Sequence, residues 1–228
     1  MNRYKLALFF LMLSDCVGAK TLSPYEASYR GYWHGLQVAA GTHKLNVAQN
    51  TYTIVSLSKP LAILPFRYYE KSIFTLKGNK VIPKLYEFKH IEKSKEKAGS
   101  IQFTAEDIAL AQANHKVCKF NLQHNSYDEL SYLVQLQMDL AQGCQEFSYD
   151  VIKINKRLTY TFKIIDKTIL KTSLGKIPTI VLSHKDEANQ RATYLWLAPD
   201  YDFLMVKVQK FKQKRLQMEA RISTYKLL

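Results

Sequence analysis

The chain has 228 residues, of which 47% are hydrophobic and 23% are charged, and its 33 lysines and arginines against 19 aspartates and glutamates give a formal net charge of +14. A chain of this length can bury enough apolar surface for a real hydrophobic core. The sequence contains no internal repeat, low-complexity tract or interdomain linker, which excludes repeat architectures. We therefore expect one β-rich domain over residues 20–228.

The first 19 residues have the pattern of a cleaved signal peptide. A positive head, Arg3 and Lys5, precedes an apolar run that is too short to span a bilayer. Small residues at positions 17–19 predict cleavage after Ala19, so the mature chain is expected to be exported and secreted across a membrane. Cys16 leaves an alternative open, lipidation of a lipoprotein-type cysteine, although the acidic residue before it fits such a site poorly.

The positive charge of an exported chain indicates phospholipid head groups, lipopolysaccharide or teichoic acid as partners, rather than nucleic acid. The densest basic segments, residues 89–97 and 207–215, alternate with apolar or acidic residues. We interpret both as solvated outer faces of strands. No segment after the leader approaches the roughly 18 consecutive apolar residues of a membrane helix, so no transmembrane segment is expected in the mature chain.

Most of the mature chain is typical of short antiparallel strands, because β-branched and aromatic residues recur in runs separated by turn signals. The apolar stretch 58–67, with its two prolines, is predicted to be a loop. Alternation with a period of two predicts which side chains face inward. Along residues 157–164 these are Leu158, Tyr160, Phe162 and Ile164. Along residues 216–222 they are Leu216, Met218, Ala220 and Ile222, with Gln217, Glu219 and Arg221 on the wet face.

One segment, residues 126–143, predicts an amphipathic helix. Ser126 and Glu129 have the spacing of a capping box, and Gly143 is placed as the residue after the helix end. Between them, residues at intervals of three and four form a mostly apolar stripe: Leu130, Leu133, Val134, Gln137, Met138 and Ala141.

Cys118 and Cys144 are the two cysteines of the mature chain, and they flank the predicted helix. An even number of cysteines in an exported chain favours a disulfide between them. Two separate buried thiols remain the alternative. Their spacing, without a nearby second cysteine or histidine pair, argues against a zinc site.

Sequence motifs for catalysis, metals or cofactors are not found. The six histidines have no metal-ligand spacing, and there is no nucleophile elbow or phosphate-binding loop. Two Ser-x-x-Lys matches, beginning at Ser56 and Ser173, lack the accompanying motifs and are attributed to chance. Residues 184–191, "HKDEANQR", contain groups suited to acid–base chemistry but are interpreted as a charged hairpin tip. We expect no enzyme, no metal and no cofactor.

Several segments together resemble the family known as domain of unknown function 3108, exported proteins mainly of Gram-negative bacteria. Residues 128–143 look like its Asp-x-Leu-Ser helix, and residues 172–223 look like its C-terminal module, with a T-x-x-G turn and a T-x-x-W-x-x-P-D hairpin. Met205 stands where that family commonly has proline. The resemblance implies a periplasmic location and a mainly antiparallel β fold, without an established activity. The residues that carry it most specifically are Asp128, Leu130, Ser131, Gly175, Trp196, Pro199 and Asp200.

The sequence thus predicts a mainly β fold, a curved antiparallel sheet or incomplete barrel with one amphipathic helix. Our leading hypothesis is a non-enzymatic protein of the cell envelope that binds an apolar or lipid-like ligand, with an anionic lipid or another envelope component as partner. The alternative is a structural or interaction module in envelope assembly. We interpret Trp196 as an inward anchor, Pro199 and Asp200 as a turn, and the lysines from 207 to 214 as an outer face. Candidate cavity-lining residues, for which a filled core is the alternative, are Tyr29, Trp33, Leu133, Met138, Tyr160, Phe162, Tyr194 and Trp196.

Overall fold

The computed structural model describes residues 22–228 except 62–65, 93–94 and 115. The predicted signal peptide, its cleavage site after Ala19 and the alternative lipidation site at Cys16 lie outside the described residues. The middle of the apolar stretch 58–67 lies outside them as well, and the ends of that stretch belong to two neighbouring strands rather than to a loop.

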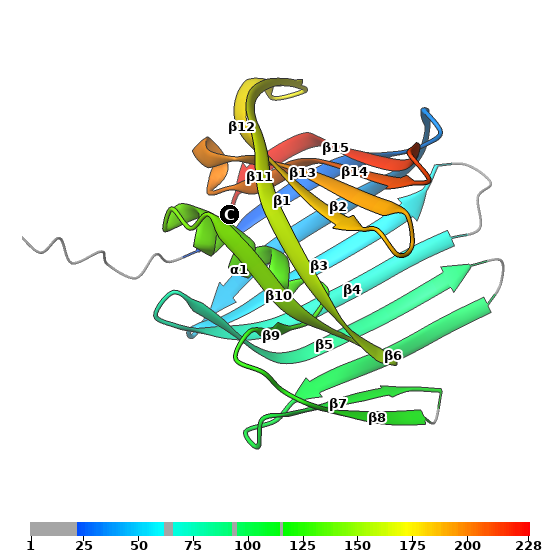
Figure 1. The fold of residues 1–228 in the computed structure, drawn as a ribbon, viewed down its shortest axis with the longest axis vertical. Helices are drawn as coiled ribbons and strands as arrows, with labels where there is room; N and C mark the ends of the chain where they lie inside the picture. The colour runs from blue at the N-terminus through cyan, green and yellow to red at the C-terminus, as the bar shows by residue number, and fades with distance from the viewer. Residues whose placement is uncertain (1–21, 62–65, 93–94, 115) are drawn as a thin grey trace, which may run out of the picture.

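One continuous sheet of fifteen strands makes up most of the fold. Its order runs from β8 to β1, then from β15 to β10, and ends at β9, so two antiparallel meanders join where β1 pairs with β15. The sheet curves without closing, because β8 and β9 lie at opposite ends of this order (Figure 1). The predicted curved antiparallel sheet is confirmed, and β9 adds a parallel pairing with β10. The strands are β1 (Tyr25–Trp33), β2 (Leu36–Ala48), β3 (Thr51–Pro60), β4 (Phe66–Lys77), β5 (Lys80–Glu92), β6 (Lys95–Phe103), β7 (Ile108–Ala113), β8 (Lys116–Asn121), β9 (Ser126–Tyr127), β10 (Glu146–Lys153), β11 (Lys156–Thr172), β12 (Gly175–Asp186), β13 (Arg191–Ala198), β14 (Leu204–Lys212) and β15 (Arg215–Leu227).

Helix α1 (Ser131–Ala141) lies inside the curve of the sheet, behind β10 and in front of β3–β5 in Figure 1. We call the sheet face turned towards α1 the concave face and the opposite face the convex face. Most side chains of α1 are buried, among them Leu136 and Met138. The rings of Tyr52 and Phe74 stack at 5.4 Å in the same core. The helix therefore fills one end of the curved sheet with packed side chains.

The N-terminus of α1 differs from the prediction. Ser126 belongs to β9, and its hydroxyl accepts a hydrogen bond from the Gln123 N–H at 2.8 Å, so the predicted capping box with Glu129 is wrong. The C-terminus agrees with the prediction: Gly143 has φ +77°, a conformation that glycine adopts without strain. Its N–H donates to the carbonyl of Leu140 at 3.0 Å and ends the helix.

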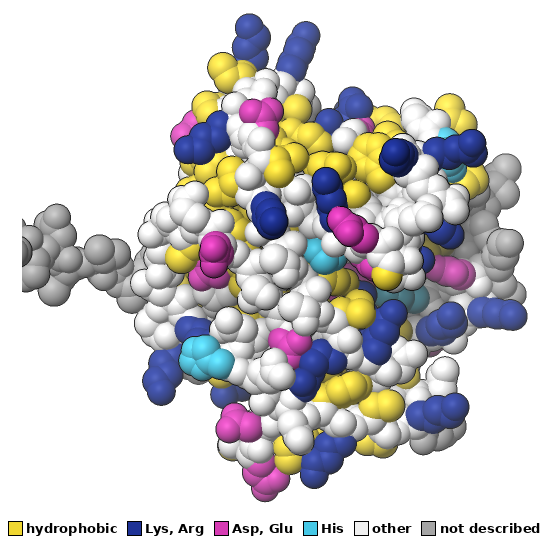
Figure 2. All heavy atoms as spheres, in the orientation of Figure 1, with side chains coloured by type: hydrophobic (Ala, Val, Ile, Leu, Met, Phe, Trp, Pro, Cys, Tyr) yellow, Lys and Arg dark blue, Asp and Glu magenta, His cyan; other side chains and the backbone are white. Residues whose placement is uncertain are grey.

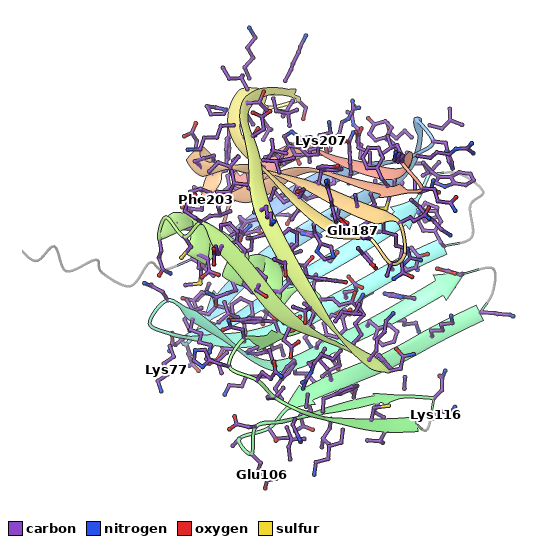
Figure 3. All side chains as sticks on the ribbon, in the orientation of Figure 1. Lys77, Glu106, Lys116, Glu187, Phe203 and Lys207 are labelled. Atoms are coloured by element: carbon purple, nitrogen blue, oxygen red, sulfur yellow. The ribbon has the colours of Figure 1, made fainter. Side chains whose placement is uncertain are left out.

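The turns of the meander divide the molecule into two ends. Lys77, Phe203 and Glu106 mark the end near α1, which we call the closed end (Figure 3). Lys116 and Glu187 mark the other, open end, where the β7–β8 and β12–β13 turns lie. The core is therefore concentrated towards the closed end.

The alternation predicted along residues 157–164 is confirmed. Phe162 is buried and pairs with Phe147, while its neighbours Thr161 and Lys163 are exposed. Along residues 216–222, Ile222 is buried as predicted, but Glu219 on the expected wet face is buried too. This difference has a structural cause, because Lys207, Gln209 and Arg221 surround the Glu219 carboxylate on the convex face.

Candidate functional site

Asp128, the first residue of the family-like helix motif, anchors the N-terminus of α1. Its fully buried carboxylate accepts hydrogen bonds from the N–H groups of Leu130 and Ser131 at 2.8 and 2.9 Å. The hydroxyls of Ser131 and of Ser72 in β4 each donate to its second oxygen at 2.7 Å. Burial raises the pKa of Asp128, and these hydrogen bonds oppose that rise. The motif thus fixes the helix to the sheet.

The other motif residues also shape turns. Thr172 donates its hydroxyl to the carbonyl of Gly175 at 3.0 Å, and Gly175 has φ +107°, which a residue with a Cβ rarely adopts. Pro199 and Asp200 begin a short 3₁₀ helix, Pro199–Tyr201, which ends β13 as predicted. Gly175, Pro199 and Asp200 thus explain turns of the fold, whereas the motif residue Trp196 lies on a surface of the sheet.

A groove of about 880 Å³ opens on the convex face of β11–β14. The strand register aligns Val181, Trp196 and Lys207 across this face. The rings of Tyr194 and Phe211 meet edge to face at 5.5 Å. We call this the outer groove. Its apolar floor is made by Ile165, Val181, Ala192, Tyr194, Trp196 and Phe211, and its rim includes Lys185, Glu187, Arg191 and Lys214.

The surface views agree with this placement. Figure 2 shows hydrophobic side chains gathered over β11–β14, with lysine and arginine side chains around them. Lys207 and Glu187 both lie over this part of the molecule in Figure 3. Ile165 in the floor of the groove remains 52% exposed. An apolar surface is thus left open to solvent within a charged rim.

A second hollow of about 580 Å³ lies beside the outer groove, and we call it the basic hollow. It forms because the tip of the β11–β12 hairpin folds over β15: the Ser173 hydroxyl lies 3.0 and 2.8 Å from the carbonyls of Ile222 and Ser223, to which it can donate. Cross-strand pairing brings the cations together on the convex face. The lining of the basic hollow includes Arg30, Tyr32, Lys171, Lys207 and Arg221.

Lys207 connects the outer groove with the basic hollow. Its Nζ lies 4.2 Å from the centre of the Trp196 ring, a cation–π geometry, while the side chain itself lines the basic hollow. Buried Glu219 lies 3.6 Å from the same Nζ and also accepts from Gln209 and Arg221. Burial alone would raise the pKa of Glu219, but these hydrogen bonds and nearby cations lower it. Glu219 thus fixes two cations at the end of the apolar floor.

The predicted lining residues fall into separate places. Tyr29, Met138 and Phe162 are buried in the core, as the alternative of a filled core expects. Leu133 and Tyr160 are partly buried against that core. The structure brings only Tyr194 and Trp196 of the predicted set into the outer groove. Trp33 is 56% exposed at the last position of β1, where its strand partner is Met218.

The predicted inward direction of Trp196 is wrong. Its cross-strand neighbours are Val181 and Lys207 on the convex face, whereas Leu195 and Leu197 fill the concave face. Both alternating sets are apolar, so periodicity does not reveal which set faces the core.

The predicted outer face for residues 207–214 is correct for Lys207 and wrong for Lys210. Lys210 follows buried Val206 and Val208 in phase and lies on the concave face. The spacing of two between Val206, Val208 and Lys210 was a sequence signal that all three share the concave face, but the lysines around Lys210 obscured it. The apolar groove residues Ile165, Val181 and Phe211 were missed as well, because strand bulges and hairpin packing assemble them.

The predicted disulfide between Cys118 and Cys144 is wrong, because both cysteines are free. Cys118 lies in β8 at one end of the strand order, and Cys144 follows α1 and precedes β10 near the other. The even number of cysteines indicated pairing but contained no information about distance. The alternative of two separate buried thiols is correct only in the separation, because Cys144 is exposed and Cys118 is half-buried.

The described residues contain no group of three or more histidine, cysteine, aspartate or glutamate side chains placed to hold a metal ion. In the same part of the chain, no helix combines the length and hydropathy needed to cross a bilayer.

Comparisons with known proteins identify the family and support the fold. Residues 25–219 match the family described as "Protein of unknown function (DUF3108)". No curated protein matches the sequence significantly. A β-barrel-like protein of domain of unknown function DUF1849 from Brucella abortus is similar with a TM-score of 0.58 and 9% identity, over 91% of this chain and 98% of that one. At this identity the likeness shows the fold alone.

Two further solved structures are more distant. A protein assigned as exported, with a YmcC-like fold, from Bacteroides fragilis has a TM-score of 0.38 and 9% identity, over 92% of this chain and 98% of its own. A protein assigned as a lipoprotein from Parabacteroides distasonis has a TM-score of 0.37 and 9% identity, over 90% of this chain and 96% of its own.

Proposed function

This chain belongs to the DUF3108 family, whose function is unknown, and from that premise we propose that it is a non-enzymatic binding protein of the cell envelope. It holds a single-chain amphiphile with an anionic head group, the hydrocarbon chain in the outer groove and the head group at the basic hollow. The periplasm is the proposed compartment, after removal of residues 1–19.

The contact between Lys207 and Trp196 is the observation that carries this proposal. The ammonium sits at the boundary between an apolar floor and a group of cations, 4.2 Å from the indole ring. An amphiphile has its anionic group at the boundary of its apolar chain, so the two distributions match. Arg30 and Arg221 extend the positive side, and Phe211 and Ile165 extend the apolar side.

The size and chemistry of the groove also favour a small ligand. Its volume of about 880 Å³ lies in the range of roughly 300–1,000 Å³ that is common for small-molecule sites. Partly exposed aromatic rings on a convex strand face cost free energy unless something covers them. Tyr194, Trp196 and Phe211 supply such rings in one place.

The location in the envelope is supported by the leader pattern and by the charge. Residues 1–19 have the features of an export signal. Without Arg3, Lys5 and Asp15 of the leader, 31 basic and 18 acidic residues remain, and the resulting formal charge of +13 attracts the chain to anionic head groups. These features support an encounter with anionic lipids after export.

Native mass spectrometry of the mature chain with dodecyl phosphate tests the proposal. We expect a one-to-one complex that survives at low collision energy. Dodecyl maltoside, which has the same chain and a neutral head group, is the matched control and is expected to bind more weakly. Equal retention of both detergents, or of neither, would contradict the proposal.

A further inference from the structure

We propose that the concave face holds a second site, separate from the outer groove, for a compact oxyanion, the carboxylate or phosphate group of a small polar molecule. Lys210 is its principal ligand. This site would operate whether or not the outer groove binds an amphiphile.

Lys210 faces the interior of the curved sheet. The strand register aligns it with Thr193 in β13, and Thr193 with His184 in β12. His184 packs against the ring of Tyr160 at 5.0 Å, and Tyr160 meets Tyr132 of α1 at 5.3 Å. These contacts place Lys210 on the face that looks towards the first turn of the helix.

The opposite wall of this interior carries ionisable groups. The register aligns His43 in β2 with Ser56 in β3 and with Glu70 in β4. Glu70 lies 3.1 Å from the hydroxyl of Tyr86 and 3.1 Å from His90 Nε2. We call the space between these two walls, on the open side of α1, the inner chamber.

Small side chains leave room in the inner chamber. Gly31, Gly41 and Ala39 occupy concave positions on β1 and β2, and Ser58 pairs with Gly41. Lys210 is exposed to solvent, although enough protein lies near it for burial to lower its pKa. Figure 2 shows the surface hollowed beside β10 and β11, with histidine and acidic side chains visible within it. The chamber is thus open to water from the side of the β12–β13 turn.

No described carboxylate of the inner chamber forms a direct ion pair with Lys210. Glu70 is engaged by Tyr86 and His90, and Glu129 forms an ion pair with Lys153. Within the described ranges, no carboxylate oxygen lies within 4.0 Å of the Lys210 ammonium. Burial and the charge of Lys153 lower the pKa of Lys210, and the more distant charges of Glu129 and Glu70 oppose this only in part. A bound oxyanion would offset the repulsion between the two ammonium groups and give Lys210 a counter-charge in direct contact.

The anion site is tested by isothermal titration calorimetry of the mature chain with inorganic phosphate and, separately, with citrate. We expect one site, which Lys210→Gln weakens by at least about tenfold, the size of one charge-assisted hydrogen bond. Lys176→Gln is the matched control. Lys176 is exposed near the β11–β12 turn, and its substitution removes the same charge as Lys210→Gln. Equal weakening by both variants would mean an adventitious ion only and would overturn the site, as would no binding of either anion.

A second measurement uses the unmodified mature chain and does not depend on the folding of a variant. Trace acetylation of lysines is followed by peptide mass spectrometry, with and without phosphate. We expect phosphate to slow acetylation of Lys210 at least about fivefold while Lys176 is unchanged. Identical rates at Lys210 would overturn the site. In the Trp33→Phe variant, where Trp196 is the only indole, phosphate is expected to leave the fluorescence unchanged, which separates this site from the outer groove.

Discussion

The ammonium of Lys207 lies 4.2 Å from the centre of the Trp196 ring, on the convex face of the sheet. This pair joins the outer groove to the basic hollow and places one cation at the end of an apolar floor. The same lysine is held by buried Glu219 at 3.6 Å. A residue of the family-like hairpin motif therefore has a surface position next to a fixed positive charge.

Replacing Lys207 is expected to weaken amphiphile binding. Lys207→Gln removes the cation nearest to the apolar floor, and the Kd for dodecyl phosphate should rise by about tenfold. The loss should shrink at high salt, because screening already weakens the same attraction. Isothermal titration calorimetry with dodecyl phosphate compares the Kd of Lys207→Gln with the Kd of the control variant Lys176→Gln. Indistinguishable Kd values for the two variants would show that the basic hollow does not bind the head group.

Removing the anchor of α1 is expected to destabilise the fold. Asp128→Ala deletes the acceptor of four hydrogen bonds and leaves the hydroxyls of Ser72 and Ser131 without it. The free energy of unfolding should fall by about 3 kcal/mol. Asp128→Asn keeps an oxygen for the two N–H donors and should lose only about 1 kcal/mol. Urea denaturation measures both, and equal losses would argue against the hydrogen-bonded anchor.

The stability of the fold at acid pH should depend on Glu70. Burial alone would raise its pKa, but hydrogen bonds from His90 and Tyr86 and the charge of His90 bring it below the ordinary value of 4.5. A lowered pKa in the folded state contributes stability above pH 4.5, which is lost as the pH falls through the folded pKa. Glu70→Gln should therefore show a weaker loss of stability on acidification below pH 4.5 than the unmodified chain. Parallel curves from urea denaturation across this range would refute the assignment.

Reduction should leave the mature chain unchanged, because Cys118 and Cys144 are free thiols. Both should react with iodoacetamide in the unfolded chain without prior reduction. In the folded chain Cys144 should react first, since it is exposed and Cys118 is half-buried. Intact mass measured before and after reduction checks this prediction. A gain of two hydrogens on reduction would show that the two cysteines are bonded and would contradict it.

The fold was predictable because its signals are local. Alternation along residues 157–164 and the glycine at position 143 each depend on neighbours in sequence, and both are confirmed. The start of α1 was misplaced because Ser126 and Glu129 fit a capping pattern by spacing alone. The acceptor used instead is Asp128, which also binds Ser72, a residue 56 positions away.

The candidate sites were less predictable, because they depend on which strand face meets the helix. Tyr194 and Trp196 alternate with Leu195 and Leu197, so both faces of that strand are apolar. Only the position of α1 decides that the leucines are the buried set. The bulge in pairing between Ile164 and Asp166 and the folded tip of the β11–β12 hairpin then create hollows for which the sequence has no periodic signal.

The fluorescence of Trp196 tests the account most directly. The chain has two tryptophans, so Trp33→Phe leaves Trp196 as the only indole reporter. Titration of this variant with dodecyl phosphate is expected to shift the emission to shorter wavelength, with saturation at one equivalent, because a hydrocarbon chain would replace water at the ring. In the matched Trp196→Phe variant, Trp33 should not respond. An unchanged Trp196 spectrum at saturating ligand would contradict binding in the outer groove.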